Sequence, residues 1–200
     1  FRALAGAIIM SFSRLLKFFV LWQAAIILIT LISPRLFPLR ERYLGGGTET
    51  YLKNPLLYSR SNFDGYHYTK IAIDGYGYSQ EAFFPLYPTL IKKLAPVFKD
   101  PVLTGVIISL VSFFAGLIVF TKLLALDYPS TIIKWVVIAL LVFPTSFYFS
   151  SVYTEGLFFF LTVSAFYFAR TKRWWLAGIF GALASYTRFL GIFLFPALFI

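Results

Sequence analysis

The sequence of 200 residues contains no cysteine, one histidine and only eight acidic residues. The absence of cysteine excludes disulfide bonds and thiol chemistry. We find no spacing of His, Asp and Glu that is convincing for metal ligands, so neither a metal nor another cofactor is expected. Charged residues make up 13% of the chain, against about 25% in a typical soluble domain. This deficit argues against an ordinary soluble protein.

Long apolar stretches take the place of the missing charges, and 60% of the residues are hydrophobic. A helix needs about 20 residues to cross a membrane, because the hydrocarbon is about 30 Å thick and each residue rises about 1.5 Å. We therefore expect an all-α polytopic membrane protein whose residues 1–200 form a single transmembrane domain, as part of a longer chain. The expected helices cover residues about 15–33, 102–122, 134–152, 153–170 and 174–193, and another would begin near 189–200.

The formal net charge of +10 is spread unevenly over the two sides that these helices define. Residues 1–17, 122–134 and 170–173 hold eight basic residues and one acid, whereas the other side holds ten and seven. Short basic loops stay in the cytoplasm, while long loops cross with little regard to charge. We therefore expect a cytoplasmic N-terminus and an extracytoplasmic loop at 34–101, in the periplasm, cell exterior or ER lumen. Topology explains the positive charge, so no nucleic-acid partner is expected.

The extracytoplasmic loop contains a polar stretch, NFDGYHYTKIAIDGYGYSQEAFFPLYP, at residues 62–88. A short helix is expected between Asp64 and Gly75, because Gly often follows a helix end. Asp64 can be read as the cap of that helix or as a general base that takes a proton from an acceptor hydroxyl. At spacings of three and six residues, His67 and Lys70 would project along the same side. The tyrosines of this loop, Tyr68 among them, are interpreted as interfacial residues.

Two charged residues are expected inside the membrane, each about one helical turn from the extracytoplasmic surface. If the helix that ends at Arg170 spans the bilayer, Glu155 lies at this depth, and Arg188 reaches the same depth on the next helix. One interpretation is an ion pair that only fixes helix packing, because buried charges are usually paired. The other is that Arg188 binds an anionic headgroup through its fork of donors and Glu155 orients it.

The stretch FDGYHYTKIAIDGYGYSQEAFFPLYP resembles the PIG-V family of membrane glycosyltransferases, the GPI mannosyltransferase 2 type. The pattern is an aromatic residue with Asp-Gly, then His, Ile-Ala, Gly-Tyr and Ala-Phe-Phe-Pro-x-x-Pro. Two further stretches are similar in order, FPTSFYFSSVYTEGLFF and GALASYTRFLG, and they contain Glu155 and Arg188. Phe63 stands where the family often has Trp, and Leu190 stands where Asn is common after the Arg.

This resemblance implies a GT-C type helix bundle, in the membrane, with its active site on the extracytoplasmic face and a polyprenyl- or dolichyl-phosphate sugar as donor. It also implies that the acid of the first outer loop, Asp64, is the catalytic base. We therefore expect an inverting transferase, of the mannosyltransferase type, acting on a hydroxyl of a glycan, glycolipid or protein. Arg188, with Lys70 or His67, would stabilise the departing lipid phosphate.

Two other classes of function remain open at this point. A lipid or solute transporter, or flippase, would use Glu155 and Arg188 to line its pathway and would tolerate changes at Asp64. A scaffold without enzyme activity would keep its partner after the charges at Asp64, His67 and Arg188 are removed. The crowded loop favours the transferase, because a pathway alone does not require Asp64 and His67 outside the membrane.

Overall fold

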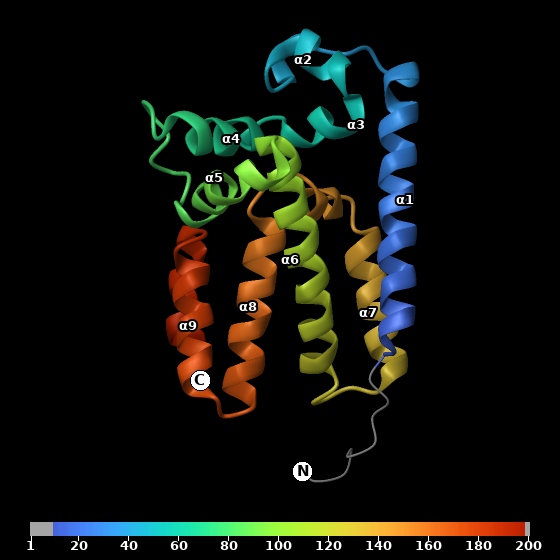
Figure 1. Cartoon of the computed structure of the whole chain (residues 1–200). Coiled ribbons are helices and arrows are strands. Elements are labelled where there is room, and N and C mark those ends of the chain that lie inside the picture. Colours follow the sequence, from blue (N-terminus) through green and yellow to red (C-terminus); the bar gives the residue numbers. More distant parts are fainter. Residues whose placement is uncertain (1–9, 199–200) are drawn as a thin grey trace.

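A computed structural model describes residues 10–198, and these residues form helices and turns without a strand. An upright bundle is capped at one end by a layer of short helices (Figure 1). The bundle contains α1 (Phe12–Leu36), α6 (Pro101–Leu124), α7 (Ser130–Val142), α8 (Glu155–Arg170), α9 (Trp174–Ser185), η4 (Phe189–Phe193) and α10 (Leu194–Ala197). The cap layer contains η1 (Glu41–Tyr43), α2 (Gly47–Lys53), α3 (Pro55–Tyr58), η2 (Ser59–Ser61), α4 (Asp64–Asp74) and α5 (Leu86–Phe98). A further 3-10 helix, η3 (Ser146–Ser150), joins α7 to α8.

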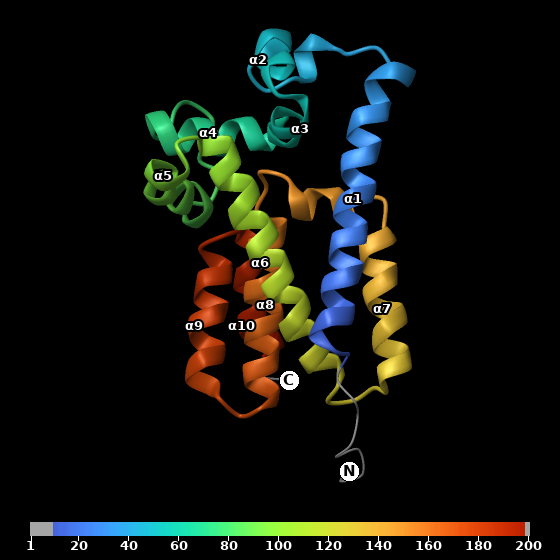
Figure 2. The same ribbon diagram turned by 45° about the vertical axis from the view of Figure 1, so that its right-hand side comes forward.

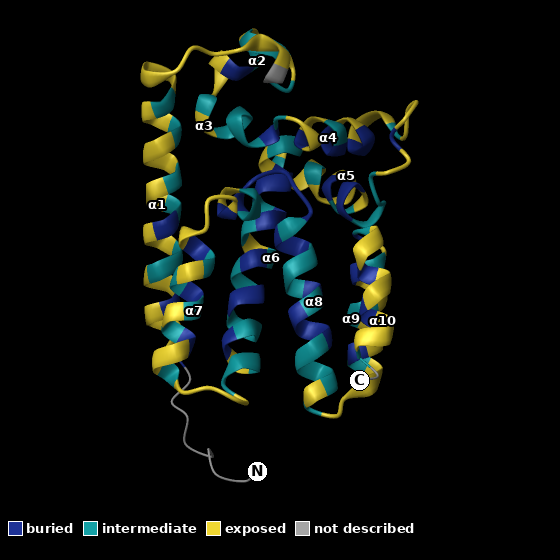
Figure 3. Cartoon of the chain, turned by 180° about the vertical axis from the view of Figure 1, so that it is seen from behind, coloured by how far each residue is buried: buried dark blue, intermediate teal, exposed yellow. Residues whose placement is uncertain are grey.

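The centre of the bundle is α6, which packs along α8, and α9 packs on the other side of α8 (Figures 1 and 2). Buried residues concentrate on the facing sides of α6 and α8, whereas most of α1 is exposed or half-buried (Figure 3). One apolar cluster joins α4, α5, α6 and α8 around Tyr68, Tyr87 and Val152. A second cluster joins α1, α6 and α7 around Trp22 and Phe113. The cap layer is therefore anchored on the α6–α8 half of the bundle.

Two helices within residues 10–198 are long and apolar enough to cross a membrane, α1 and α6. The shorter apolar helices α7 and α9 have 13 and 12 residues. The long helices alternate in direction along the chain (Figure 1). The first residues of α6 and α8 and the turn that follows α9 therefore all lie at the end of the bundle next to the cap layer (Figure 1). The expectation of an all-helical protein is confirmed for this part of the chain.

The expected helix bounds need two corrections. The helix placed at about 134–152 begins earlier, at Ser130, and ends at Val142, because Pro144 disfavours helical geometry at Phe143, which has φ −58° and ψ 134°. The helix placed at about 174–193 ends at Ser185, and Arg188 is extended, with φ −152° and ψ 145°. By contrast, the short helix expected between Asp64 and Gly75 is confirmed as α4. The beginning of the further helix expected near 189–200 falls on η4 and α10, and its last two residues lie outside the described part.

Glycines permit the close approach of α6 to the start of α8. A Cβ added to Gly156 would lie 2.6 Å from the carbonyl oxygen of Ser109, and one added to Gly105 would lie 2.7 Å from Cγ1 of Val152. Neither contact leaves room for a methyl group, since a real Cβ does not approach so closely. The sequence therefore uses glycine where two helices and the chain before α8 meet.

We predict that Gly156→Ala destabilises the protein by about 1–3 kcal/mol, because the added methyl must push α6 and α8 apart. The matched control is Gly181→Ala, in α9, where an added Cβ meets nothing within 4 Å. Ala is the better helix former by about 0.5–1 kcal/mol, so the control should unfold at an equal or higher temperature. Thermal unfolding in detergent micelles measures both, and equal unfolding temperatures would contradict this view of the helix crossing.

Candidate active site

One short segment links the cap layer to the bundle, and we call residues 150–156 the junction segment. It runs from the end of η3 into the first turn of α8, directly beneath α4. The backbone N–H of Val152 donates to the carbonyl of Arg60 at 2.8 Å, and the Val152 side chain is fully buried. The Ser109 hydroxyl on α6 donates to the carbonyl of Tyr153 at 3.1 Å. The junction segment is therefore held from the cap layer and from α6.

Asp64 is positioned by the next residue of the junction segment, Tyr153. The Tyr153 hydroxyl donates to the carbonyl of Asn62 at 2.9 Å and also hydrogen-bonds the backbone of Asp64. Burial raises the pKa of the Tyr153 phenol, and the Asp64 carboxylate raises it further, so Tyr153 stays protonated. The Asp64 side chain itself is exposed. Tyr153 thus fixes the start of α4 and leaves the Asp64 carboxylate accessible.

The interpretation of Asp64 as the helix cap is wrong. Asp64 is the first residue of α4, the cap position is Phe63, and no side chain makes a cap hydrogen bond there. Phe63 has φ 52° and ψ −120°, a backbone conformation that costs free energy for a residue other than glycine. Such strain persists only where neighbouring contacts enforce it, and here Gly65 packs against the carbonyl of Val152. The Asp64 carboxylate is therefore not consumed by capping.

Glu155 and Arg188 form an ion pair, as the sequence suggested. Arg188 Nη1 donates to Glu155 Oε1 at 2.6 Å, and the two side chains are 35% and 28% exposed. Glu155 is the first residue of α8, where the helix dipole favours a negative charge. Its other oxygen, Oε2, is buried without a hydrogen-bond partner among the described residues. The carboxylate can therefore hold Arg188 and still accept a hydrogen bond from a ligand.

Arg188 is presented by a tight turn between α9 and η4. Its guanidinium lies 5.9 Å from the ring centroid of Phe158, on α8. The N–H of Gly191 donates to the Arg188 carbonyl at 2.9 Å, and Gly191 packs so closely on the backbone of Ser185 that no side chain fits. The same turn contacts the cap layer, because Leu86 N–H donates to the carbonyl of Tyr186 at 3.1 Å. The arginine therefore lies below the start of α5.

Tyr68 lies one helical turn after Asp64, and its pKa responds to the charges of Asp64, Glu155 and Arg188. The pKa of Tyr68 is raised to about 12, mainly by burial. A hydrogen bond with Thr154 and the positive charge of Arg188 lower this pKa. The negative charges of Glu155 and Asp64 raise it. The Tyr68 hydroxyl thus lies within electrostatic range of both carboxylates and of the arginine. It stays protonated near neutral pH, so it can donate a hydrogen bond but cannot serve as a base.

His67 and Lys70, also on α4, make no contact with the Glu155–Arg188 pair that the described residues show. His67 Nδ1 is 3.2 Å from Gln80 Nε2, and the imidazole stacks on Phe83 at 4.9 Å between ring centroids. Lys70 is exposed. The described contacts therefore pair Glu155 with Arg188, tie the junction segment just before Glu155 to the chain beside Asp64, and place His67 against the loop after α4. No three His, Asp or Glu side chains gather as a metal site within residues 10–198.

Sequence reasoning missed Tyr68, Tyr153 and Thr154 as site residues. The sequence alone favours an interfacial role for Tyr68, although its spacing of four residues from Asp64 places both on one face of a helix. The two others lie in the motif SSVYTEG, directly before Glu155. Their position beside Glu155, an acid expected inside the membrane, was the available signal, but only the structure shows that they contact the chain at the start of α4.

Comparison with known proteins identifies a family for this chain. The family model described as mannosyltransferase (PIG-V) matches residues 8–195, which include the cap layer, the junction segment and the turn that holds Arg188. No curated protein and no solved structure matches the chain.

The Glu155–Arg188 pair should contribute measurably to stability. In a double-mutant cycle with Glu155→Gln and Arg188→Gln, we expect a coupling of about 1 kcal/mol, because water still reaches an arginine that is 35% exposed. The control is the cycle of Asp127→Asn and Arg170→Gln, which tests the exposed pair at the opposite end of the bundle.

The control pair should couple more weakly and lose its coupling in high salt, because exposed charges are screened. Chemical unfolding at two salt concentrations measures both cycles. Equal coupling in the two cycles would show that Glu155 and Arg188 gain nothing from their half-buried position.

Proposed function

The chain belongs to the PIG-V mannosyltransferase family, and from that premise we propose that it transfers mannose from a polyprenyl- or dolichyl-phosphate donor to an acceptor hydroxyl with inversion at the anomeric carbon. The family makes it a glycosyltransferase of the mannosyltransferase type. The observation that carries the finer proposal is that the junction segment holds the start of α4 through Tyr153 and places the Glu155–Arg188 pair two residues later, while the Asp64 carboxylate stays accessible.

The proposed site lies at the extracytoplasmic end of a multi-pass bundle. α1 and α6 are long enough to span a bilayer, α8 runs beside α6, and α9 runs beside α8 (Figures 1 and 2). The opposite end of the bundle carries Lys122, Arg170, Lys172 and Arg173, with Asp127 paired to Arg170. Basic residues in short loops mark the cytoplasmic side. The cap layer and the site beneath it then face the periplasm, cell exterior or ER lumen, where a lipid-linked donor is held in the membrane.

Asp64 acts as the general base in this proposal. Its carboxylate takes the proton of the acceptor hydroxyl, whose oxygen attacks the anomeric carbon from the face opposite the phosphate. The bond between the anomeric carbon and the phosphate oxygen breaks, and the polyprenyl phosphate leaves with the electron pair. Tyr153 holds the start of α4 in place, and the Asp64 carboxylate does not cap the helix. The carboxylate is therefore free to act as a base, which supports this assignment.

Arg188 stabilises the leaving phosphate. One of its donors is occupied by Glu155, and the remaining N–H groups of the guanidinium fork are available for phosphate oxygens. Glu155 orients the fork, and its unpaired Oε2 can accept a hydrogen bond from a sugar hydroxyl. Charge that is already oriented toward the leaving group lowers the barrier without reorganisation during the reaction. Lys70 and His67 keep a proposed role in substrate binding, with His67 fixed by Gln80 and Phe83.

Asp64→Asn should lower turnover with a polyprenyl-phosphate mannose donor by about 10²–10⁴, because the amide cannot accept the proton. Asp74→Asn is the matched control, since Asp74 is the exposed last residue of the same helix. The control should retain activity, and both variants should unfold near the wild-type temperature. A folded Asp64→Asn protein with near wild-type turnover would remove Asp64 from this role.

Arg188→Lys separates phosphate binding from packing. Lys retains the charge opposite Glu155 but loses the planar fork, so we expect a near-normal unfolding temperature and a loss of about tenfold or more in kcat/KM. Steady-state kinetics and thermal unfolding of Arg188→Lys and Arg188→Gln test this. Activity that falls only in proportion to stability in both variants would assign the pair to helix packing alone.

A further inference from the structure

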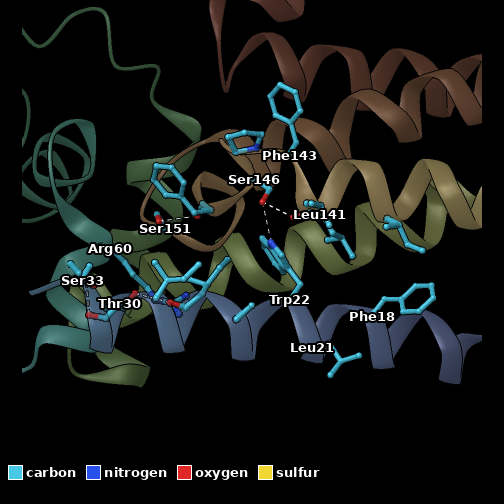
Figure 4. A pocket seen from close by; sticks show the side chains of 18 of the residues that line it. Phe18, Leu21, Trp22, Thr30, Ser33, Arg60, Leu141, Phe143, Ser146 and Ser151 are labelled. Atoms are coloured by element: carbon cyan, nitrogen blue, oxygen red, sulfur yellow. Dashed lines mark hydrogen bonds between the residues drawn. The ribbon is translucent and has the colours of Figure 1, made fainter. Parts of the chain in front are cut away.

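A cavity lies between α1 and α7, next to the first residues of the junction segment. Its volume is about 710 Å³, which is in the range of small-molecule sites, and apolar side chains of both helices line most of it (Figure 4). Along α1 it extends from Phe18 to Ser33, or about 22 Å at 1.5 Å per residue. Leu21 and Ile29 line it and are 67% and 65% exposed, so the cavity opens toward the surroundings of the bundle.

The cavity has one polar end, which lies next to the cap layer. Arg60 and Ser59, from η2, line this end together with Thr30 and Ser33 of α1, and Figure 4 places Arg60 beside them and Phe18 toward the far end. The hydroxyls of Thr30 and Ser33 donate within α1, to the carbonyls of Ile26 and Thr30. The Ser59 hydroxyl oxygen is buried without a hydrogen-bond partner among the described residues. The polar end therefore offers an unused hydroxyl beside an arginine.

Arg60 is a half-buried cation without a carboxylate partner. Its Nη1 donates to Ser150 O at 2.9 Å and to Gln23 Oε1 at 3.3 Å, and both acceptors are neutral. The ion pairs within residues 10–198 are Arg170–Asp127 and Arg188–Glu155, so neither includes Arg60. The Nη2 and Nε donors of Arg60 remain available. Burial lowers the pKa of Arg60, which shows that the site disfavours an uncompensated positive charge. An anion at the polar end would relieve this cost.

We propose that this cavity binds a phosphate-headed lipid, with an aliphatic chain between α1 and α7 and the phosphate on Arg60 and Ser59. The apolar length and the unpaired cation at one end complement an amphiphile of that kind. The cavity is separate from the proposed active site, because Asp64, Tyr68, Glu155 and Arg188 do not line it. The two arginines contact opposite ends of the junction segment, Arg60 at Ser150 and Arg188 at Glu155. A lipid bound here would stabilise the segment that positions the site.

The test uses the full-length protein in dodecyl maltoside, a detergent with an uncharged headgroup. The probe is phosphatidic acid with a diazirine in its acyl chain, compared with diacylglycerol that carries the same chain, and adducts are mapped by mass spectrometry. We expect adducts on α1 and α7 residues that line the cavity, with the phosphate-headed probe captured about tenfold better at equal concentration. Arg60→Gln should abolish this preference, and thermal unfolding in detergent checks that the variant is folded.

A matched pair of variants tests the chain-binding part without altering Arg60. Ala25 lines the cavity and the adjacent Ala24 does not, although both are exposed. Ala25→Trp should fill the cavity and reduce capture of phosphatidic acid about tenfold, while Ala24→Trp should leave it unchanged. Four results would overturn the proposal. Both variants could capture phosphatidic acid equally, or the protein could capture both probes equally. The adducts could be spread evenly over exposed apolar residues, or another part of the full-length chain could occupy the cavity.

Discussion

The hydrogen bonds between the junction segment and the chain just before α4 determine where the charges of this protein lie. Residues 150–156 contact the cap layer through Val152 and Tyr153 and the bundle through Ser109, and they then begin α8 at Glu155. Because these hydrogen bonds hold the segment from both sides, it cannot shift without breaking some of them. An exposed carboxylate, Asp64, and an arginine held by Glu155 are thereby fixed at one end of the bundle.

The junction segment also separates two halves of the bundle that differ in packing, the α6–α8 half and the α1–α7 half. The α6–α8 half is tightly packed around glycines and supports the site where mannose transfer is proposed. The α1–α7 half is looser, with an apolar cavity that ends at Arg60, and Arg60 contacts the first residue of the junction segment. Lipid in that cavity and substrate in the site would then act on one structural element from opposite ends.

Sequence reasoning succeeded where the pattern is local and strong. The apolar runs without charges indicate a helical membrane protein. The expected depth of Glu155 and Arg188 in the membrane, where a charge is costly, was enough to suggest that the two form an ion pair. It failed where the outcome depends on tertiary contacts. The end of α7 follows from Pro144, but the role of Tyr153 and the strained backbone of Phe63 depend on packing between segments that lie 91 residues apart in the sequence. The environment of Tyr68 required the same long-range information.

The most direct test of the account is a structure of the full-length protein with polyprenyl-phosphate mannose in a lipid nanodisc. The account predicts the donor phosphate within hydrogen-bond distance, about 3 Å, of the Arg188 guanidinium, and the anomeric carbon on the side of Asp64. A phosphate bound elsewhere, with Asp64 and Arg188 both facing away from the sugar, would contradict it.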